Sequence, residues 1–346
     1  MANRSAYMPT FCRHNHLVQN CPICAREQNI ELRPVVSPGA ARAGQSGSAA
    51  PRSRASTLGG SAPRTRASAS RAGSRTGLTV RRLERGAEDG YRSPLAPGLK
   101  SGADAERLAE ELAFAVTRLA RLVADPPGLY AEVAVTGDSI EERTWLAFLI
   151  AYLGPLDGEL PFAGIEQVRT LWSSGADPEL DGAQTGPRTA HDVARGARTL
   201  QAYRTWAARA GSQAAAFTGE SAWTPERRFA RVFERLSLPG LDRGARFDLL
   251  TTLGRTGVYE LSAGALHLGG SDPVTLGAKR VFGIGDPLLL ERRAAELAAA
   301  SELPLEAFDV GLYNWERGSR ARLGMDPGDQ PDAATLSSTL AALGLS

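Results

Sequence analysis

The chain has 346 residues, of which 42% are hydrophobic and 23% charged, so it is long enough for one large domain or two ordinary ones with a buried core. It contains no run of about 18 apolar residues, which excludes a transmembrane helix, and its N-terminus lacks the apolar core of a signal peptide. Residues 1–100 hold 16 basic and 5 acidic side chains, a net +11, whereas the remainder carries a net −9. A basic arm on an acidic body indicates contact with a polyanion, most simply nucleic acid, although an unfolded Arg-rich linker has the same composition.

All three cysteines lie near the N-terminus: Cys12, Cys21 and Cys24. With His14 they form Cys-x-His followed by Cys-x-x-Cys, and three thiolates with one imidazole suit a closed, structural zinc site. His16 is an alternative fourth ligand, and a redox Cys-x-x-Cys pair is an alternative use of the thiols. We therefore expect residues 1–30 to be a zinc knuckle, in a chain whose clustered cysteines fit a reducing cytoplasm.

Composition divides the rest of the chain into a linker, an entry segment, a helical domain and a tail. Residues 31–77 are mainly Ser, Ala, Gly, Arg and Pro, and such a segment buries too little surface to offset its conformational entropy. We expect it to be a disordered basic linker, followed by a partly ordered entry segment at 78–100. Residues 101–325 predict one helical domain, and residues 326–346 form a tail with a short helix near 333–343.

Helix signals recur through the predicted domain. Apolar positions at helical spacing predict a helix over 104–124, and Ser139 with Glu142 forms a capping box for the next one. The other expected helices are 189–210 and those starting at Thr224-Pro225, Asp242, Asp272-Pro273, Asp286-Pro287 and Pro304. The only strand candidate is AEVAV at 131–135, so the sequence predicts an all-α fold.

A tight Gly283-Ile284-Gly285 turn separates two of these helices. Glycine at both ends lets the backbone approach a ligand closely, and the following helix presents free amides and the positive end of its dipole. This arrangement resembles a helix-hairpin-helix, which grips a nucleic-acid backbone without reading its sequence. The alternative is that Gly283 simply ends one helix and Asp286 caps the next.

Asp309 lies 24 residues beyond Gly285, inside an apolar helix, where a carboxylate must pair, cap or act. An aspartate at a similar place follows the hairpin in the helix-hairpin-helix base-excision glycosylases, which this segment resembles. Lys279, before the hairpin, is then the candidate partner of Asp309 or a phosphate contact. No lysine follows the turn closely, which argues against Schiff-base lyase chemistry. The bland alternatives are a buried ion pair for Asp309 and a solvated side chain for Lys279.

Over roughly 105–320, the segments RFDLLTTLGRTGVYEL, GAKRVFGIGD and EAFDVGLYNW resemble the alpha-glutamyl/putrescinyl thymine pyrophosphorylases, clade 3. The resemblance implies a glycosylase-like helical enzyme that displaces pyrophosphate from a 5-hydroxymethyl-uracil pyrophosphate in DNA with an amine. It implies DNA as substrate and a 5-hydroxymethyl-uracil DNA kinase in the same pathway.

On this interpretation the hairpin amides of Gly283 and Gly285, with Lys279 and the arginines Arg280 and Arg292, would hold the leaving phosphates. Asp309 would anchor or deprotonate the amine. Asn314 and Trp315 would contact the base, although such side chains are more often part of a core or a helix cap.

Two further hypotheses remain open: a glycosylase with a pocket for an extruded base, and a non-catalytic zinc-bearing nucleic-acid adaptor. The adaptor hypothesis predicts Asp309 in a buried salt bridge and no cleft. In each case we expect a cytoplasmic, nucleoid-associated protein.

Overall fold

The computed structural model describes residues 86–345, and all twelve of the helices described below lie in this part of the chain. The expected zinc knuckle and basic linker lie outside the described residues. The helices are α2 (Gly102–Ala124), α3 (Leu129–Ala134), α4 (Ile140–Leu153), α5 (Ala163–Val168), α6 (Gly196–Arg209), α7 (Gln213–Thr218), α8 (Pro225–Arg235), α9 (Arg243–Arg255), α10 (Pro273–Phe282), α11 (Pro287–Ala300), α12 (Ala307–Arg317) and α13 (Ala333–Leu343). Residues 86–345 contain no strand, which confirms the all-α prediction for them.

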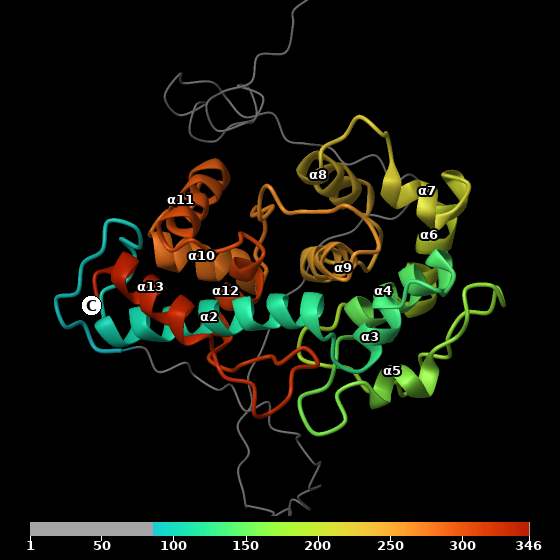
Figure 1. Cartoon of the computed structure of the whole chain (residues 1–346), viewed down its shortest axis with the longest axis horizontal. Helices are drawn as coiled ribbons and strands as arrows, with labels where there is room; N and C mark the ends of the chain where they lie inside the picture. The colour runs from blue at the N-terminus through green and yellow to red at the C-terminus, as the bar shows by residue number, and fades with distance from the viewer. Residues whose placement is uncertain (1–85, 346) are drawn as a thin grey trace, which may run out of the picture. The chain divides into compact units, whose positions relative to one another are not determined.

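The helices form two groups that are joined by α2 (Figure 1). The first half of α2 packs against α12 and α13, and its second half reaches α9. We call α3 to α9 the central group and α10 to α13 the C-terminal group. Because one long amphipathic helix contributes buried residues to both, the two groups share a continuous hydrophobic core.

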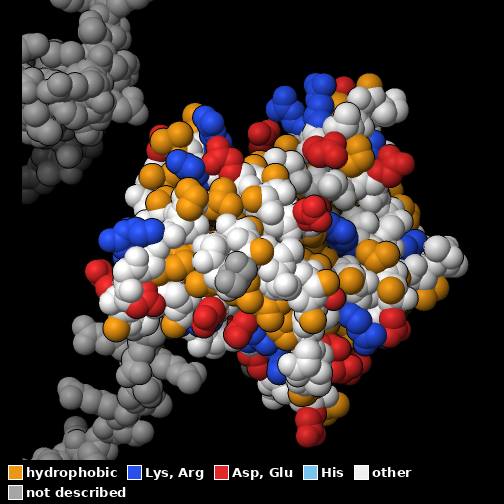
Figure 2. Space-filling model, turned by 60° about the vertical axis from the view of Figure 1, so that its left-hand side comes forward, with side chains coloured by type: hydrophobic (Ala, Val, Ile, Leu, Met, Phe, Trp, Pro, Cys, Tyr) orange, Lys and Arg blue, Asp and Glu red, His pale blue; other side chains and the backbone are white. Residues whose placement is uncertain are grey.

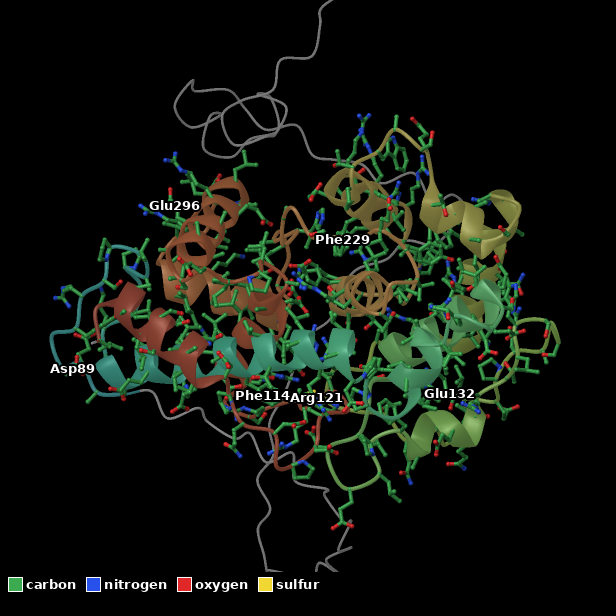
Figure 3. The ribbon with its side chains drawn as sticks, in the orientation of Figure 1. Asp89, Phe114, Arg121, Glu132, Phe229 and Glu296 are labelled. Atoms are coloured by element: carbon green, nitrogen blue, oxygen red, sulfur yellow. The ribbon has the colours of Figure 1, made fainter. Side chains whose placement is uncertain are left out.

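The central group is built around aromatic side chains. Ten of the fourteen residues of α4 are buried, and Phe148 stacks on Tyr203 of α6 with ring centroids 3.9 Å apart. Phe229 of α8 packs edge-on against Phe247 of α9 at 5.2 Å, between the two helices in Figure 3. These contacts fix the start of α9, which contributes to the site described below.

Helices predicted from a cap followed by proline begin where the sequence indicates. Thr224, Asp272 and Asp286 each accept a hydrogen bond from an amide of the first turn, and proline follows each cap. Asp242 also caps α9, by accepting the amide of Ala245, although no proline follows it.

Two of the wrong local predictions concern α3 and α4. The segment 131–135, expected as a strand, lies almost wholly in α3, whose last carbonyls accept hydrogen bonds from Arg143. The capping box at Ser139 does not form, because the Glu142 carboxylate instead accepts the amides of Trp172 and Ser173. Both outcomes depend on contacts with residues that lie outside the local sequence pattern from which each prediction was made.

Candidate functional site: a polar cavity over a buried arginine–aspartate bridge

Asp309 is buried between two arginines. Its Oδ2 accepts a hydrogen bond from Arg188 Nη2 at 2.6 Å, and its Oδ1 accepts one from Arg243 Nη1 at 2.6 Å. The carboxylate is 3% exposed, and the two arginine side chains are 4% and 8% exposed. Asp309 therefore pairs with Arg188 and Arg243, and Lys279 is not its partner.

The bridge keeps all three groups charged. Burial alone raises the pKa of Asp309, but Arg188 and Arg243 outweigh it and hold the pKa below its usual value. Burial lowers the pKa of Arg188, and the charge of Asp309 more than offsets this, so the pKa is raised. A carboxylate held ionised by two guanidinium groups is a weak base, which favours a positioning role for Asp309.

A second buried ion pair lies close to the first. Arg118 of α2 donates to Asp248 of α9 at 2.9 Å and to the Tyr130 hydroxyl at 3.3 Å. Burial raises the pKa of Tyr130 to about 12, so the phenol stays protonated. Together the two bridges place three arginines and two aspartates inside the fold, each with an opposite charge in contact.

A cavity of about 160 Å³ opens beside the Asp309 bridge, between the central and C-terminal groups. The loop before α6, the starts of α9 and α10, and the second half of α12 line it: Pro187, Arg188, Thr189, Asp242, Gly244, Asp272, Pro273, Val274, Tyr313 and Arg317. The cavity thus combines arginines, carboxylates and the first turns of two helices.

Backbone packing holds Arg188 in the cavity wall. Gly186 donates to the carbonyls of Leu153 and Gly154 at the end of α4, and a Cβ on Gly186 would lie 1.9 Å from the Pro155 carbonyl oxygen. Only glycine permits this close approach. The Tyr313 hydroxyl donates to the Pro187 carbonyl at 2.6 Å, which fixes the loop to α12.

The hairpin residues expected from the sequence are at the surface. Gly283 ends α10 in the left-handed conformation, with φ 66°, and a Cβ on Gly285 would meet no atom within 4 Å. No hydrogen bond engages the amides of Ile284, Gly285 and Asp286 within the described residues. The turn is therefore open on its outer side.

The hairpin and Asp309 lie at opposite ends of α10. Gly277 packs on the Leu312 carbonyl, and Arg280 pairs with Glu316, so α10 and α12 run side by side in the same direction. Asp309 lies beside the start of α10, whereas Gly283 follows its end, about 15 Å away for ten residues at 1.5 Å each. The structure does not bring these two predicted features into one hollow.

The other predicted site residues have structural partners. The Lys279 ammonium donates to the Gly270 carbonyl at 3.2 Å, and Arg292 pairs with Glu296 on the outer face of α11 (Figure 3). Asn314 donates to Glu111 and accepts the amide of Ala321. Trp315 is fully buried, and its indole donates to the Asp104 carbonyl. Asn314 and Trp315 thus belong to the core in this conformation.

A larger cavity, of about 380 Å³, lies between α3, α4 and residues 169–171. Most of its charged groups are engaged: Glu132 pairs with Arg169, Glu142 binds two amides, and Arg143 binds two carbonyls. The smaller cavity, with unsatisfied cationic groups, is the stronger candidate.

Arg188, Arg243 and Arg317 were not predicted from the sequence. One signal was available: Arg243 is the first residue of α9, directly after the cap Asp242, where the helix dipole disfavours a cation. An arginine at that position indicates a carboxylate supplied from elsewhere in the fold. No comparable pattern marks Arg188 or Arg317.

Over residues 86–345, the fold and the site define an all-helical body with a small charged cavity between two groups of helices. Residues 188–313 match a family model, alpha-glutamyl/putrescinyl thymine pyrophosphorylase clade 3, which agrees with the resemblance seen in the sequence. No curated protein and no solved structure matches the chain. The matched range begins at Arg188 and ends at Tyr313, and it contains every residue that lines the cavity except Pro187 and Arg317.

Proposed function

We propose that the protein modifies a thymine-derived base in DNA by replacing pyrophosphate with an amine. In the proposed step, the amine nitrogen bonds to the exocyclic methylene carbon of a 5-hydroxymethyl-uracil pyrophosphate. The carbon–oxygen bond to pyrophosphate breaks, the nitrogen loses a proton, and pyrophosphate leaves. The observation that carries the proposal is the coincidence of the family match with the cavity.

The charges of the cavity suit this chemistry. The departing group is an anion and the incoming amine is cationic before it loses a proton, and the cavity offers arginines together with two carboxylates, Asp242 and Asp272. We propose that Asp272 binds the incoming amine and accepts its proton, because the Asp272 side chain is 23% exposed whereas Asp309 is enclosed by its arginines. The modified methyl group already lies in the major groove, so the reaction does not require complete extrusion of the base.

The hairpin gives DNA a place to bind. The open amides of 284–286 and the dipole of α11 suit backbone phosphates, as in a helix-hairpin-helix of the glycosylase type. A separation of about 15 Å along α10 would place this contact a few nucleotides from the reacting base. A 5-hydroxymethyl-uracil DNA kinase would supply the phosphorylated base.

The experiment is mass spectrometry of nucleosides from DNA that carries the pyrophosphorylated base, incubated with the protein and candidate amines. Asp272→Asn keeps the helix cap, because asparagine caps as well as aspartate, but it removes the charge. We expect loss of the aminated nucleoside with Asp272→Asn. Asp332→Asn, the same change at the exposed cap of α13, serves as the control and should retain activity.

The buried bridge at Asp309 is what the non-catalytic adaptor hypothesis predicts, so that function is the second candidate. DNA binding with no new nucleoside for any amine would favour it. A released free base in the same spectra would instead indicate a glycosylase, although the cavity is smaller than the roughly 300 Å³ or more of typical ligand pockets. We retain the N-terminal zinc site as a proposal, and close to one zinc per chain, released to a chelator, is the expected result.

A further inference from the structure

Two arginines meet over one aromatic ring in the cavity. The guanidinium carbon of Arg188 lies 4.7 Å from the centroid of the Tyr313 ring, and that of Arg317 lies 5.7 Å from it. Arg188 is buried in the cavity wall, whereas Arg317 is exposed in the last turn of α12. Two cations that line the same cavity favour a bound anion there.

Both arginines have unused donors. The buried Arg188 Nη1 has no hydrogen-bond partner, and the Arg317 side chain forms no hydrogen bond or ion pair within the described residues. An unsatisfied buried donor is costly unless a ligand or water accepts from it. The unpartnered Nη1 is the observation that points to a ligand.

The start of α9 adds backbone donors beside Arg188. Gly244 lines the cavity, and a Cβ there would lie 3.5 Å from Arg188 Nη2, so a residue without a side chain leaves this approach open. The cap Asp242 accepts the amide of Ala245, and no group of residues 86–345 accepts a hydrogen bond from the amide of Gly244. This amide carries the positive end of the α9 dipole.

Each carboxylate around the cavity already accepts hydrogen bonds from the protein. Asp309 binds Arg188 and Arg243, and Asp272 accepts two amides and the Thr275 hydroxyl of its own helix. Asp242 is the cap of α9. These contacts leave Arg188 Nη1 and the guanidinium of Arg317 without an acceptor among the described residues. A ligand with several negative charges and several acceptor oxygens is favoured over a monoanion.

We propose that Arg188, Arg317 and the Gly244 amide form a clamp for a diphosphate group, with Tyr313 supporting both guanidinium groups. Asp309 is the positioning residue that holds Arg188. The cavity, of about 160 Å³, has room for a diphosphate. The identity of the anion as the leaving group rests on the proposed function. The clamp itself rests on the geometry.

The test is isothermal titration of the full-length protein with inorganic pyrophosphate and, separately, with inorganic phosphate. Arg317→Ala is the decisive variant, because the side chain is exposed and its removal leaves the core intact. We expect about tenfold weaker pyrophosphate binding, as for the loss of one charge-assisted contact, and partial rescue by Arg317→Lys. The matched control is Arg209→Ala, another exposed arginine in the last turn of a helix, which should bind as the native protein does.

Equal pyrophosphate affinities for the native protein and Arg317→Ala would overturn the clamp, as would undetectable binding to the native protein. Equal affinity for phosphate and pyrophosphate would overturn the preference for a diphosphate. Formation of the aminated nucleoside by Arg317→Ala at the native rate would refute the clamp and leave the proposed function standing. Clamp-dependent pyrophosphate binding without any nucleoside product would refute the proposed function and leave the clamp standing.

Discussion

At the scale of single residues, the Arg188–Asp309–Arg243 bridge decides how the site is understood. A carboxylate in an apolar helix suggested a catalytic acid or base, but the same pattern arises when a carboxylate must neutralise two buried guanidinium groups. Its lowered pKa agrees with the second explanation. Asp309 then acts through the arginines that it orients.

Asp309→Asn should therefore destabilise the protein by about 3–5 kcal/mol, because it leaves two buried cations without their counter-charge. The measurement is urea denaturation at pH 7. Glu296→Gln is the matched control: Glu296 also receives two arginines, Arg292 and Arg293, but at the surface of α11, where the loss should stay below about 1 kcal/mol. Similar losses for the two variants would contradict the buried-bridge explanation.

His267 should make stability depend on pH. Burial, followed by the nearby charge of Arg243, lowers its pKa from 6.5 to about 4. The unfolded chain binds the proton more tightly, so the stabilisation is complete above the unfolded pKa and declines as pH falls from 6.5 toward 4. His267→Asn, which tolerates the residue's φ of 55°, should flatten the stability curve in this window. The free energy of unfolding of the variant would be measured by urea denaturation at pH 4.5 and at pH 7. If its change between the two pH values equals that of the native protein, the pH dependence belongs to other groups.

At the scale of elements, the sequence predicted the helix starts that depend only on neighbouring residues. Caps followed by proline located the starts of α8, α10 and α11, since both features act within one turn. The start of α6 was predicted at 189 but lies at 196, where no side chain caps the helix. Thr189 there donates instead to the Tyr152 carbonyl of α4, a contact that the sequence does not reveal.

The sequence likewise indicated single residues of the site but not the distant residues that they contact. The sequence drew attention to Asp309 and to the hairpin, since each breaks an otherwise regular pattern. It could not indicate that Asp309 meets Arg188 and Arg243, which are 121 and 66 residues away. Nor could it show that α12 lies parallel to α10, which separates Asp309 from the hairpin.

The two hairpin glycines should differ in their tolerance of a side chain. Gly283→Ala places a Cβ in the left-handed region, 3.2 Å from Gly98 Cα, and should cost about 1–2 kcal/mol. Gly285→Ala meets open space without positive φ and should change stability by less than about 0.5 kcal/mol. Thermal and urea denaturation of both variants would check this. A larger loss for Gly285→Ala would contradict the open turn that the proposed phosphate contact requires.

At the scale of the whole molecule, charge is distributed unevenly along the chain. Basic and acidic side chains are interspersed on the face shown in Figure 2, and neither sign forms a continuous field there. No helix of the described residues is long and apolar enough to cross a membrane. Residues 86–346 carry a net −9 against +11 for residues 1–85. If the protein binds DNA as proposed, we expect nonspecific attraction to come mainly from the N-terminal residues.

This distribution predicts how DNA binding responds to salt. Each phosphate neutralised by an arginine releases counterions, so the affinity of the full-length protein should fall steeply as salt rises from 50 to about 200 mM. Residues 86–346 alone should bind more weakly and with a shallower slope, since only the hairpin and neighbouring arginines remain. Fluorescence anisotropy with a labelled duplex measures both slopes. Equal slopes for the two proteins would place the phosphate contacts on the helical body, and the basic N-terminal residues would then need a different partner.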